Sequence, residues 1–276
     1  MEIDIIKEAR NVFDIEIAEL EKLKSKLGDT FQKLVQMILE LKDNNKVIIT
    51  GIGKSGIIGK KIAATLASTG TTAVFINAAE ALHGDLGMVS NGDVVIAISN
   101  SGNSDEVLSI LAPIRKIGGK IVAFTGNPNS TLGKYAELTV NVGVEKEACP
   151  LGQAPMSSTT ATLVTGDALA ACLMKLKDFT EKEQEMIKQG LTTSEISDKE
   201  TAAKILDLVP QEWIKRIPFF VRKHATTRTI KRISVKHPEL YAVAKRSSEI
   251  PEKEREELRQ VITDIFQEKM NKHKIK

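Results

Sequence analysis

An apolar run that opens onto a glycine-rich turn is the feature that most constrains the fold of this chain. Residues Val47–Thr50 lead directly into the turn Gly51–Gly56, with the sequence GIGKSG, and a helical pattern follows. A buried strand that ends in a small-residue turn ahead of a helix is typical of a parallel α/β sheet. The pattern therefore places Gly53, Lys54 and Ser55 at the edge where such sheets bind ligands.

A second turn of the same kind follows the apolar run DVVIAI. It has the sequence SNSGNSDE and extends from Ser99 to Glu106. Hydroxyl groups and free backbone N–H groups at the start of a helix bind anions. The two turns together predict an anion site flanked by the ammonium of Lys54 and the carboxylate of Glu106. The hydroxyls of the second turn belong to Ser99, Ser101 and Ser104.

The first two thirds of the chain alternate between short β-rich runs and helical stretches. This alternation predicts an α/β fold with three layers, αβα, around a five-stranded parallel sheet joined by right-handed crossovers. Two helices broken near Gly28 precede the sheet, and a helix of small residues capped by Ser157 or Ser158 follows it. The expected strands are 47–50, 73–76, 94–99, 121–125 and 138–142, and the helices between them are 56–68, 80–86, 104–117 and 131–135.

The pattern changes after Phe179, which divides the chain into residues 1–179 and a helical, basic C-terminal domain or arm, 180–276. Ten Lys or Arg residues lie between Trp213 and Arg246, against the single acid Glu239. Charged helical surfaces are usually solvated, so we favour that interpretation over a patch for nucleic acid or another acidic partner. The aromatic residues of this segment are expected to pack a small core; they are Trp213, Phe219, Phe220 and Tyr241.

The composition excludes several classes of protein. Two cysteines, Cys149 and Cys172, do not make a disulfide framework, which favours a reducing, cytoplasmic compartment. No apolar run reaches the roughly 18 to 20 residues that a membrane span needs. No His, Cys and Asp spacing predicts a zinc site, so we expect no required metal.

Five motifs in this order resemble the sugar isomerase (SIS) domain, and more narrowly the arabinose 5-phosphate isomerase family. The resemblance covers residues 3–179. It implies interconversion of D-arabinose 5-phosphate and D-ribulose 5-phosphate without a cofactor, by a homodimer or homotetramer whose sites draw on adjoining subunits. The motifs are GIGKSG, AAEALHGDLGM, ISNSGNSDE, TGNPNST and EACPLGQAPMSSTTATLVTGDALA.

The same resemblance assigns catalytic roles to Lys54, Glu106 and Glu147, and places His83 in the active-site cleft. Isomerisation through an enediol needs a base over two carbons and a cation for the oxyanion. Lys54 suits the oxyanion, and either Glu106 or Glu147 could be the base. The phosphate would be bound by Gly53, Ser55, Ser99, Ser101, Ser104, Ser157, Ser158 and Thr159.

The chain departs from the family pattern after the SIS domain. Relatives carry an HPGGSLG-like segment, whose histidine acts in a neighbouring site, and then a pair of CBS modules. Here His237 and Pro238 share only that dipeptide. His83 is therefore the candidate for acid–base work in place of the distal histidine. The alternative function is a non-catalytic sugar-phosphate sensor whose basic tail contacts a partner.

Overall fold

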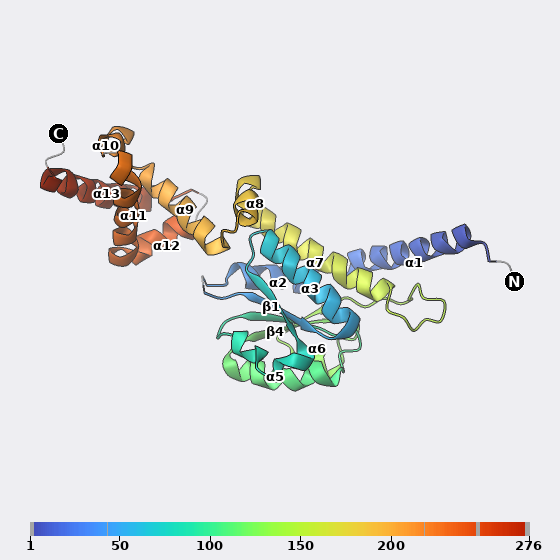
Figure 1. Ribbon diagram of the computed structural model, residues 1–276. Coiled ribbons are helices and arrows are strands. Elements are labelled where there is room, and N and C mark those ends of the chain that lie inside the picture. Colours follow the sequence, from blue (N-terminus) through green and yellow to red (C-terminus); the bar gives the residue numbers. More distant parts are fainter. Residues whose placement is uncertain (1–2, 43, 218, 247–248, 274–276) are drawn as a thin grey trace. The chain divides into compact units, whose positions relative to one another are not determined.

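The protein divides into two compact units, Met1–Gln184 and Glu185–Lys276 (Figure 1). The computed structural model describes residues 3–42, 44–217, 219–246 and 249–273. The boundary predicted after Phe179 lies close to this division. The first unit is an α/β unit and the second is a helical unit.

The α/β unit begins with two helices, α1 (Ile5–Lys26) and α2 (Asp29–Leu39), separated near Gly28 as the sequence predicts. The sheet and its connecting helices follow. They are β1 (Val47–Gly51), α3 (Gly53–Ser68), β2 (Ala73–Asn77), α4 (Ala78–Ala81), the 3₁₀-helix η1 (Asp85–Met88), β3 (Val94–Ile98), α5 (Asp105–Ile117), β4 (Lys120–Thr125), α6 (Thr131–Tyr135), β5 (Leu138–Asn141) and α7 (Ser157–Leu176).

All five strands pair in parallel, in the order β2-β1-β3-β4-β5, which confirms the predicted sheet. In register, Val47 faces Ala73 of β2 on one side and Val94 of β3 on the other. The chain therefore places β2 on one side of β1, then crosses back and adds β3, β4 and β5 on the other side. The carboxyl ends of β1 and β3 define a topological switch point, where open α/β sheets bind ligands.

The strands bury both of their faces. Val47 and Ile49 of β1 point into one core with α2, α3 and α7, whereas Ile48 points into a second core with α4, α5 and α6. Figure 1 shows α5 and α6 on the side of the sheet opposite α3 and α7. Since side chains alternate along a strand, this two-sided burial explains the continuous apolar runs of the sequence.

One local prediction is wrong. Residues 80–86 were expected to form a single helix, but α4 ends at Ala81 and η1 begins at Asp85. Gly84, with φ 133°, lies between them in a conformation that no helix contains. The turn carries His83.

The helical unit packs around its own apolar core. Trp213 and Tyr241 are partly buried against this core, as predicted, and the side chains of Phe219 and Phe220 lie outside the described residues. None of the described helices is long and apolar enough to cross a membrane. The helices are α8 (Glu181–Lys188), which runs across the division between the units, α9 (Thr193–Leu206), α10 (Gln211–Arg216), α11 (Phe219–Lys236), α12 (Pro238–Arg246) and α13 (Glu252–His273).

Candidate active site

The two glycine-rich turns meet at the switch point. Gly53, with φ 53°, is the first residue of α3, so Lys54 and Ser55 lie in the first turn of that helix. The turn is close to the end of β3, because a Cβ added to Gly51 would lie 3.0 Å from the carbonyl oxygen of Ile98. The sheet thus brings the β1–α3 turn against the β3–α5 turn.

The β3–α5 turn is held by its own hydroxyls. Ser99 Oγ and Ser104 Oγ are 3.0 Å apart, and the backbone N–H of Gly102 donates to Ser99 Oγ at 3.1 Å. Only glycine fits at position 102, where φ is 67° and a Cβ would overlap Ser130 Oγ at 1.9 Å. The hydroxyl of Ser101 accepts from the Asn103 N–H at 3.2 Å. The predicted phosphate-binding serines of this turn are therefore close together and ordered.

Helix α7 runs alongside α3 and in the same direction. Gly166 of α7 packs against Ile62 of α3, and each lies nine residues after the start of its helix. At 1.5 Å per residue, both helices begin about 14 Å from this contact. At the other end, Lys177 Nζ donates to Thr71 Oγ1 at 2.8 Å. The first turn of α7 is therefore level with Lys54.

Glu147 caps α7, so the prediction that Ser157 or Ser158 caps this helix is wrong. The N-cap residue is Met156, which makes no side-chain capping bond, and Ser157 Oγ accepts instead from the Ala148 N–H at 3.0 Å. Glu147 Oε2 accepts from the N–H groups of Met156 at 2.8 Å and Ser158 at 3.3 Å. The structure thus brings Glu147, Ser157 and Ser158 together at the start of α7.

Two hydroxyls in this region have no hydrogen-bond partner among the described residues, Ser158 Oγ and Thr50 Oγ1, although both are buried. Thr159, in contrast, donates to the Met156 carbonyl oxygen at 2.8 Å. An unsatisfied buried polar group is costly, so it normally requires a functional or structural explanation. The unpartnered Ser158 hydroxyl at a helix start fits a site that binds a polar ligand.

The remaining candidates share the same edge of the sheet but are separate from one another. Lys54 lies at the start of α3, Glu106 in the first turn of α5, and His83 in the turn that follows β2 and α4. All three side chains are exposed, whereas Glu147 is half-buried. Burial and the two hydrogen bonds that it accepts from the start of α7 distinguish Glu147 from Glu106.

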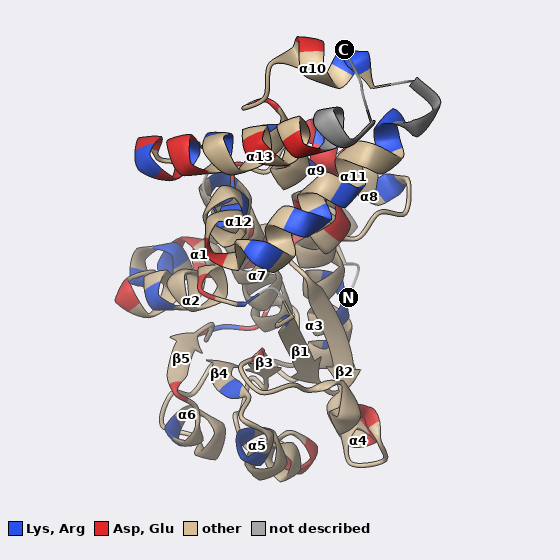
Figure 2. Ribbon diagram, turned by 90° about the vertical axis from the view of Figure 1, so that its left-hand side faces the viewer, with Lys and Arg blue, Asp and Glu red and all other residues tan. Residues whose placement is uncertain are grey.

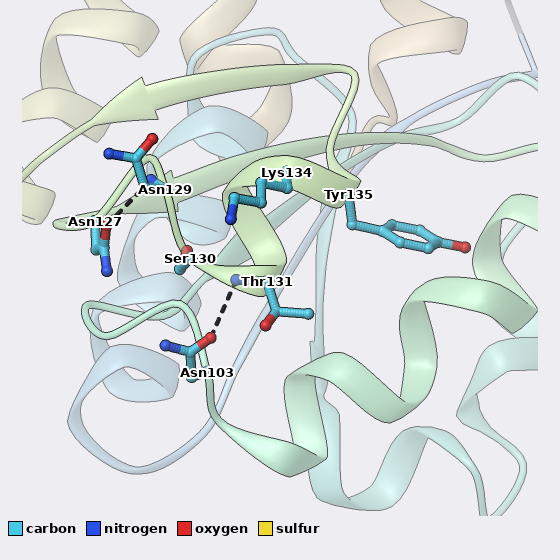
Figure 3. Close-up of a pocket in the computed structure, with 7 residues that line it drawn as sticks. All are labelled: Asn103, Asn127, Asn129, Ser130, Thr131, Lys134 and Tyr135. Carbon is cyan, nitrogen blue, oxygen red and sulfur yellow. Dashed lines mark hydrogen bonds between the residues drawn. The ribbon is translucent and has the colours of Figure 1, made fainter.

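A shallow pocket of about 420 Å³, lined mainly by residues with polar side chains, lies beside this edge, and none of the predicted site residues lines it (Figure 3). In it, Asn103 Oδ1 accepts from the Thr131 N–H at 3.0 Å, and Asn127 Oδ1 accepts from the Asn129 N–H at 3.1 Å. The first of these bonds ties the β3–α5 turn to α6. The lining consists of Asn103, Asn127, Asn129, Ser130, Thr131, Lys134 and Tyr135.

Sequence reasoning missed two polar residues whose hydrogen bonds join separate elements of this unit, Asn103 and Glu19. Glu19 of α1 is only 4% exposed. A signal for it existed, because Glu19 follows Val12 and Ile15 and precedes Leu23 at helical spacing, so a carboxylate occupies a core-facing position. Such a residue needs a partner elsewhere in the fold.

The described residues contain no group of three or more His, Cys, Asp and Glu side chains that could hold a metal ion. The chemistry that the site offers is that of one ammonium, two carboxylates, one imidazole and a set of hydroxyls. Groups of these kinds are suited to binding an anion and to moving protons.

The fold and this edge define a doubly wound α/β domain with two glycine-rich turns at its switch point. The SIS domain family matches residues 40–172. A solved protein of E. coli CFT073, c3406, in complex with arabinose 5-phosphate, is 40% identical with a TM-score of 0.65, and covers 68% of this chain and 100% of its own. The chain belongs to the SIS domain family.

Curated relatives match the same region. Arabinose 5-phosphate isomerase KdsD of Francisella tularensis is 54% identical over 179 residues, which is 64% of this chain and 55% of that protein. Arabinose 5-phosphate isomerase GutQ of Escherichia coli K12 is 45% identical over 65% of this chain and 55% of its own. The chain spans about half the length of the curated relatives it matches.

Proposed function

We propose that this protein is a sugar-phosphate aldose–ketose isomerase that interconverts D-arabinose 5-phosphate and D-ribulose 5-phosphate. The observation that supports the proposal is that α3 and α7 run in the same direction and begin at the same height. The turn that carries Lys54 therefore lies beside the start of α7, which Glu147 caps. Relatives of that name, and a solved relative that binds this sugar phosphate, support the choice of substrate.

The phosphate is bound by Ser55 and by the hydroxyls and N–H groups of the β3–α5 turn and the start of α7. A carboxylate, Glu147 or Glu106, removes the proton from C2 of the aldose, and the electrons move onto the carbonyl oxygen O1. Lys54 stabilises the resulting enediolate as a point charge. The proton then returns to C1 while O2 loses its proton, and His83 transfers protons between the two oxygens. The reaction is redox-neutral.

The exposed apolar stripe of α1 supports the second part of the proposal, a homodimer or homotetramer. Ile6, Phe13 and Ile17 recur at spacings of seven and four and are 60%, 68% and 55% exposed. We infer that a second copy covers them. Light scattering tests this: Phe13→Glu should lower the molecular mass, and an unchanged mass would contradict a contact through α1.

We further infer a cytoplasmic setting, in keeping with the two free thiols of Cys149 and Cys172. The exposed cations of α11, among them Lys223, Arg228 and Lys231, are proposed to be solvated (Figure 2). Affinity for random-sequence DNA that falls steeply between two salt concentrations would contradict that proposal, because it is typical of phosphate contacts.

The function is tested by incubating the purified protein with arabinose 5-phosphate in D₂O. We expect ribulose 5-phosphate that carries solvent deuterium at C1, because the proton that the base removes from C2 exchanges with D₂O before the base protonates C1. Ribulose 5-phosphate without deuterium would point to direct transfer and contradict an exchanging base. Binding without conversion would instead support the sensor.

A further inference from the structure

Helix α1 holds the segment that carries Glu147. The carboxylate of Glu19 accepts from the backbone N–H of Glu145 at 2.6 Å through Oε2, and from Lys22 Nζ at 2.8 Å through Oε1. Lys22 Nζ also donates to the Glu145 side chain at 2.6 Å. One buried carboxylate and one lysine thus bind both the backbone and the side chain of a residue two positions before Glu147.

The same segment is held from its other side by α7. The Ala148 N–H donates to Ser157 Oγ, and Glu147 itself accepts from the start of α7. A further bond joins α1 to α7, because Thr160 Oγ1 donates to Glu16 Oε2 at 2.9 Å. Glu16 and Glu19 are one helical turn apart, so α1 aligns both the segment and the helix that Glu147 caps.

The charge state of Glu19 agrees with this arrangement. Burial by itself would raise the pKa of Glu19. The hydrogen bonds from Lys22 and from the backbone N–H groups of Glu145 and Lys146 outweigh burial, and the pKa lies below its ordinary value. The side chain is therefore a carboxylate with both oxygens engaged.

We propose that Glu19 is a positioning residue for the isomerisation, which fixes the Glu147 carboxylate by binding the backbone two residues before it. The inference rests on the proposed function. One of its phosphate-binding parts, the turn Ser99–Ser104, is held by contacts of its own. Loss of Glu19 should therefore lower kcat by a larger factor than it raises KM.

The variant Glu19→Gln keeps the size of the side chain but replaces one accepting oxygen with an NH₂ group, which cannot accept. We expect kcat to fall about tenfold to a hundredfold, as small misplacements of a reacting group do. Amide hydrogen exchange in residues 143–156 should become faster, with little change in the sheet. The matched control is Glu21→Gln, because Glu21 lies on the same helix and, among the residues that the structure describes, pairs only with the exposed Lys24, at 3.1 Å.

Two results would contradict the role proposed for Glu19, and a third would contradict the proposed function. A kcat per folded molecule equal to that of the unchanged protein, or exchange that rises uniformly, would overturn the inference and leave a purely structural role for Glu19. If the unchanged protein converts no arabinose 5-phosphate, the proposed function fails. The exchange experiment then still tests whether Glu19 holds residues 143–156.

Discussion

The two units use buried polar side chains differently. In the α/β unit, Glu19, Asp93 and Ser157 are at most 4% exposed, and each accepts a hydrogen bond from a separate segment of the chain. This unit also has buried threonines that bond within their own helix, Thr162 and Thr165. In the described part of the helical unit, the buried polar side chains are threonines such as Thr201, which donates to the Ser197 carbonyl of its own helix.

In the α/β unit, some buried polar side chains join separate elements, whereas in the described part of the helical unit the buried threonines donate hydrogen bonds within single helices. Polar groups that link separate elements need precise partners and cost stability when unpaired, so they are typical of places where geometry matters. A threonine that donates to a carbonyl of its own helix, as Thr201 does, joins no separate elements through that bond. We therefore propose that the chemistry lies in the α/β unit.

The strongest test of this contrast compares two aspartates. Asp93 is fully buried and accepts from Lys46 Nζ at 2.8 Å, whereas Asp198 of the helical unit is 52% exposed and pairs with Lys245 at 3.1 Å. We expect Asp93→Ala to cost about 3–5 kcal/mol in the free energy of unfolding, because it leaves a lysine without its partner, and Asp198→Ala about 1 kcal/mol or less. Denaturant unfolding measures both. Equal losses would break the comparison.

A second test concerns catalysis. Lys54→Met should lower kcat about a hundredfold, or about 2.7 kcal/mol in the activation barrier, because it removes the cation that stabilises the enediolate. Lys60→Met is the matched control, since Lys60 is an exposed lysine further along the same helix. Steady-state kinetics measures both variants. If both lose activity equally, Lys54 acts through general charge or folding and not at the site.

Acid should affect the α/β unit more than the helical unit. Burial alone would raise the pKa of Asp93, but bonds from Lys46, the Ser90 N–H and Asn45 outweigh it and lower the pKa. A lowered folded-state pKa contributes stability above the unfolded value of about 4, and this stability is lost as the pH falls below it. Thermal unfolding of Asp93→Asn between pH 7 and pH 3 should therefore show a shallower loss than that of the unchanged protein. If both proteins lost thermal stability equally between pH 7 and pH 3, Asp93 would not be the cause of the acid sensitivity.

The smallest expected effect is that of removing the helical unit. Residues 1–180 should fold and turn over substrate like the full chain, since the E. coli CFT073 relative is covered completely by 68% of this chain. Phe179 must be kept, because its ring packs on Gly70, where a Cβ would lie 2.5 Å away. Kinetics and light scattering of the shortened protein test this. A large loss of turnover at unchanged mass would give the helical unit a direct part in the site.

Local patterns predicted much of the α/β unit. The apolar runs identified all five strands, and the turns GIGKSG and SNSGNSDE identified the edge that carries the site. The two failures have different causes. Residues 80–86 have a helical composition, but Gly84 takes a positive φ, and Ser157 resembles a cap but bonds to Ala148 because a returning segment supplies a competing donor.

The sequence by itself determined the elements, their parallel arrangement and the types of side chain at the ends of the strands, because these depend on periodicity and turn chemistry within a few residues. Only the tertiary structure decided the strand order that creates the switch point, the parallel alignment of α7 with α3, and the contacts of Glu147 and Glu19. The physical reason is that these contacts join residues far apart in the chain, as Glu19 and Glu145 are, and no local pattern encodes which distant partner a buried polar group finds.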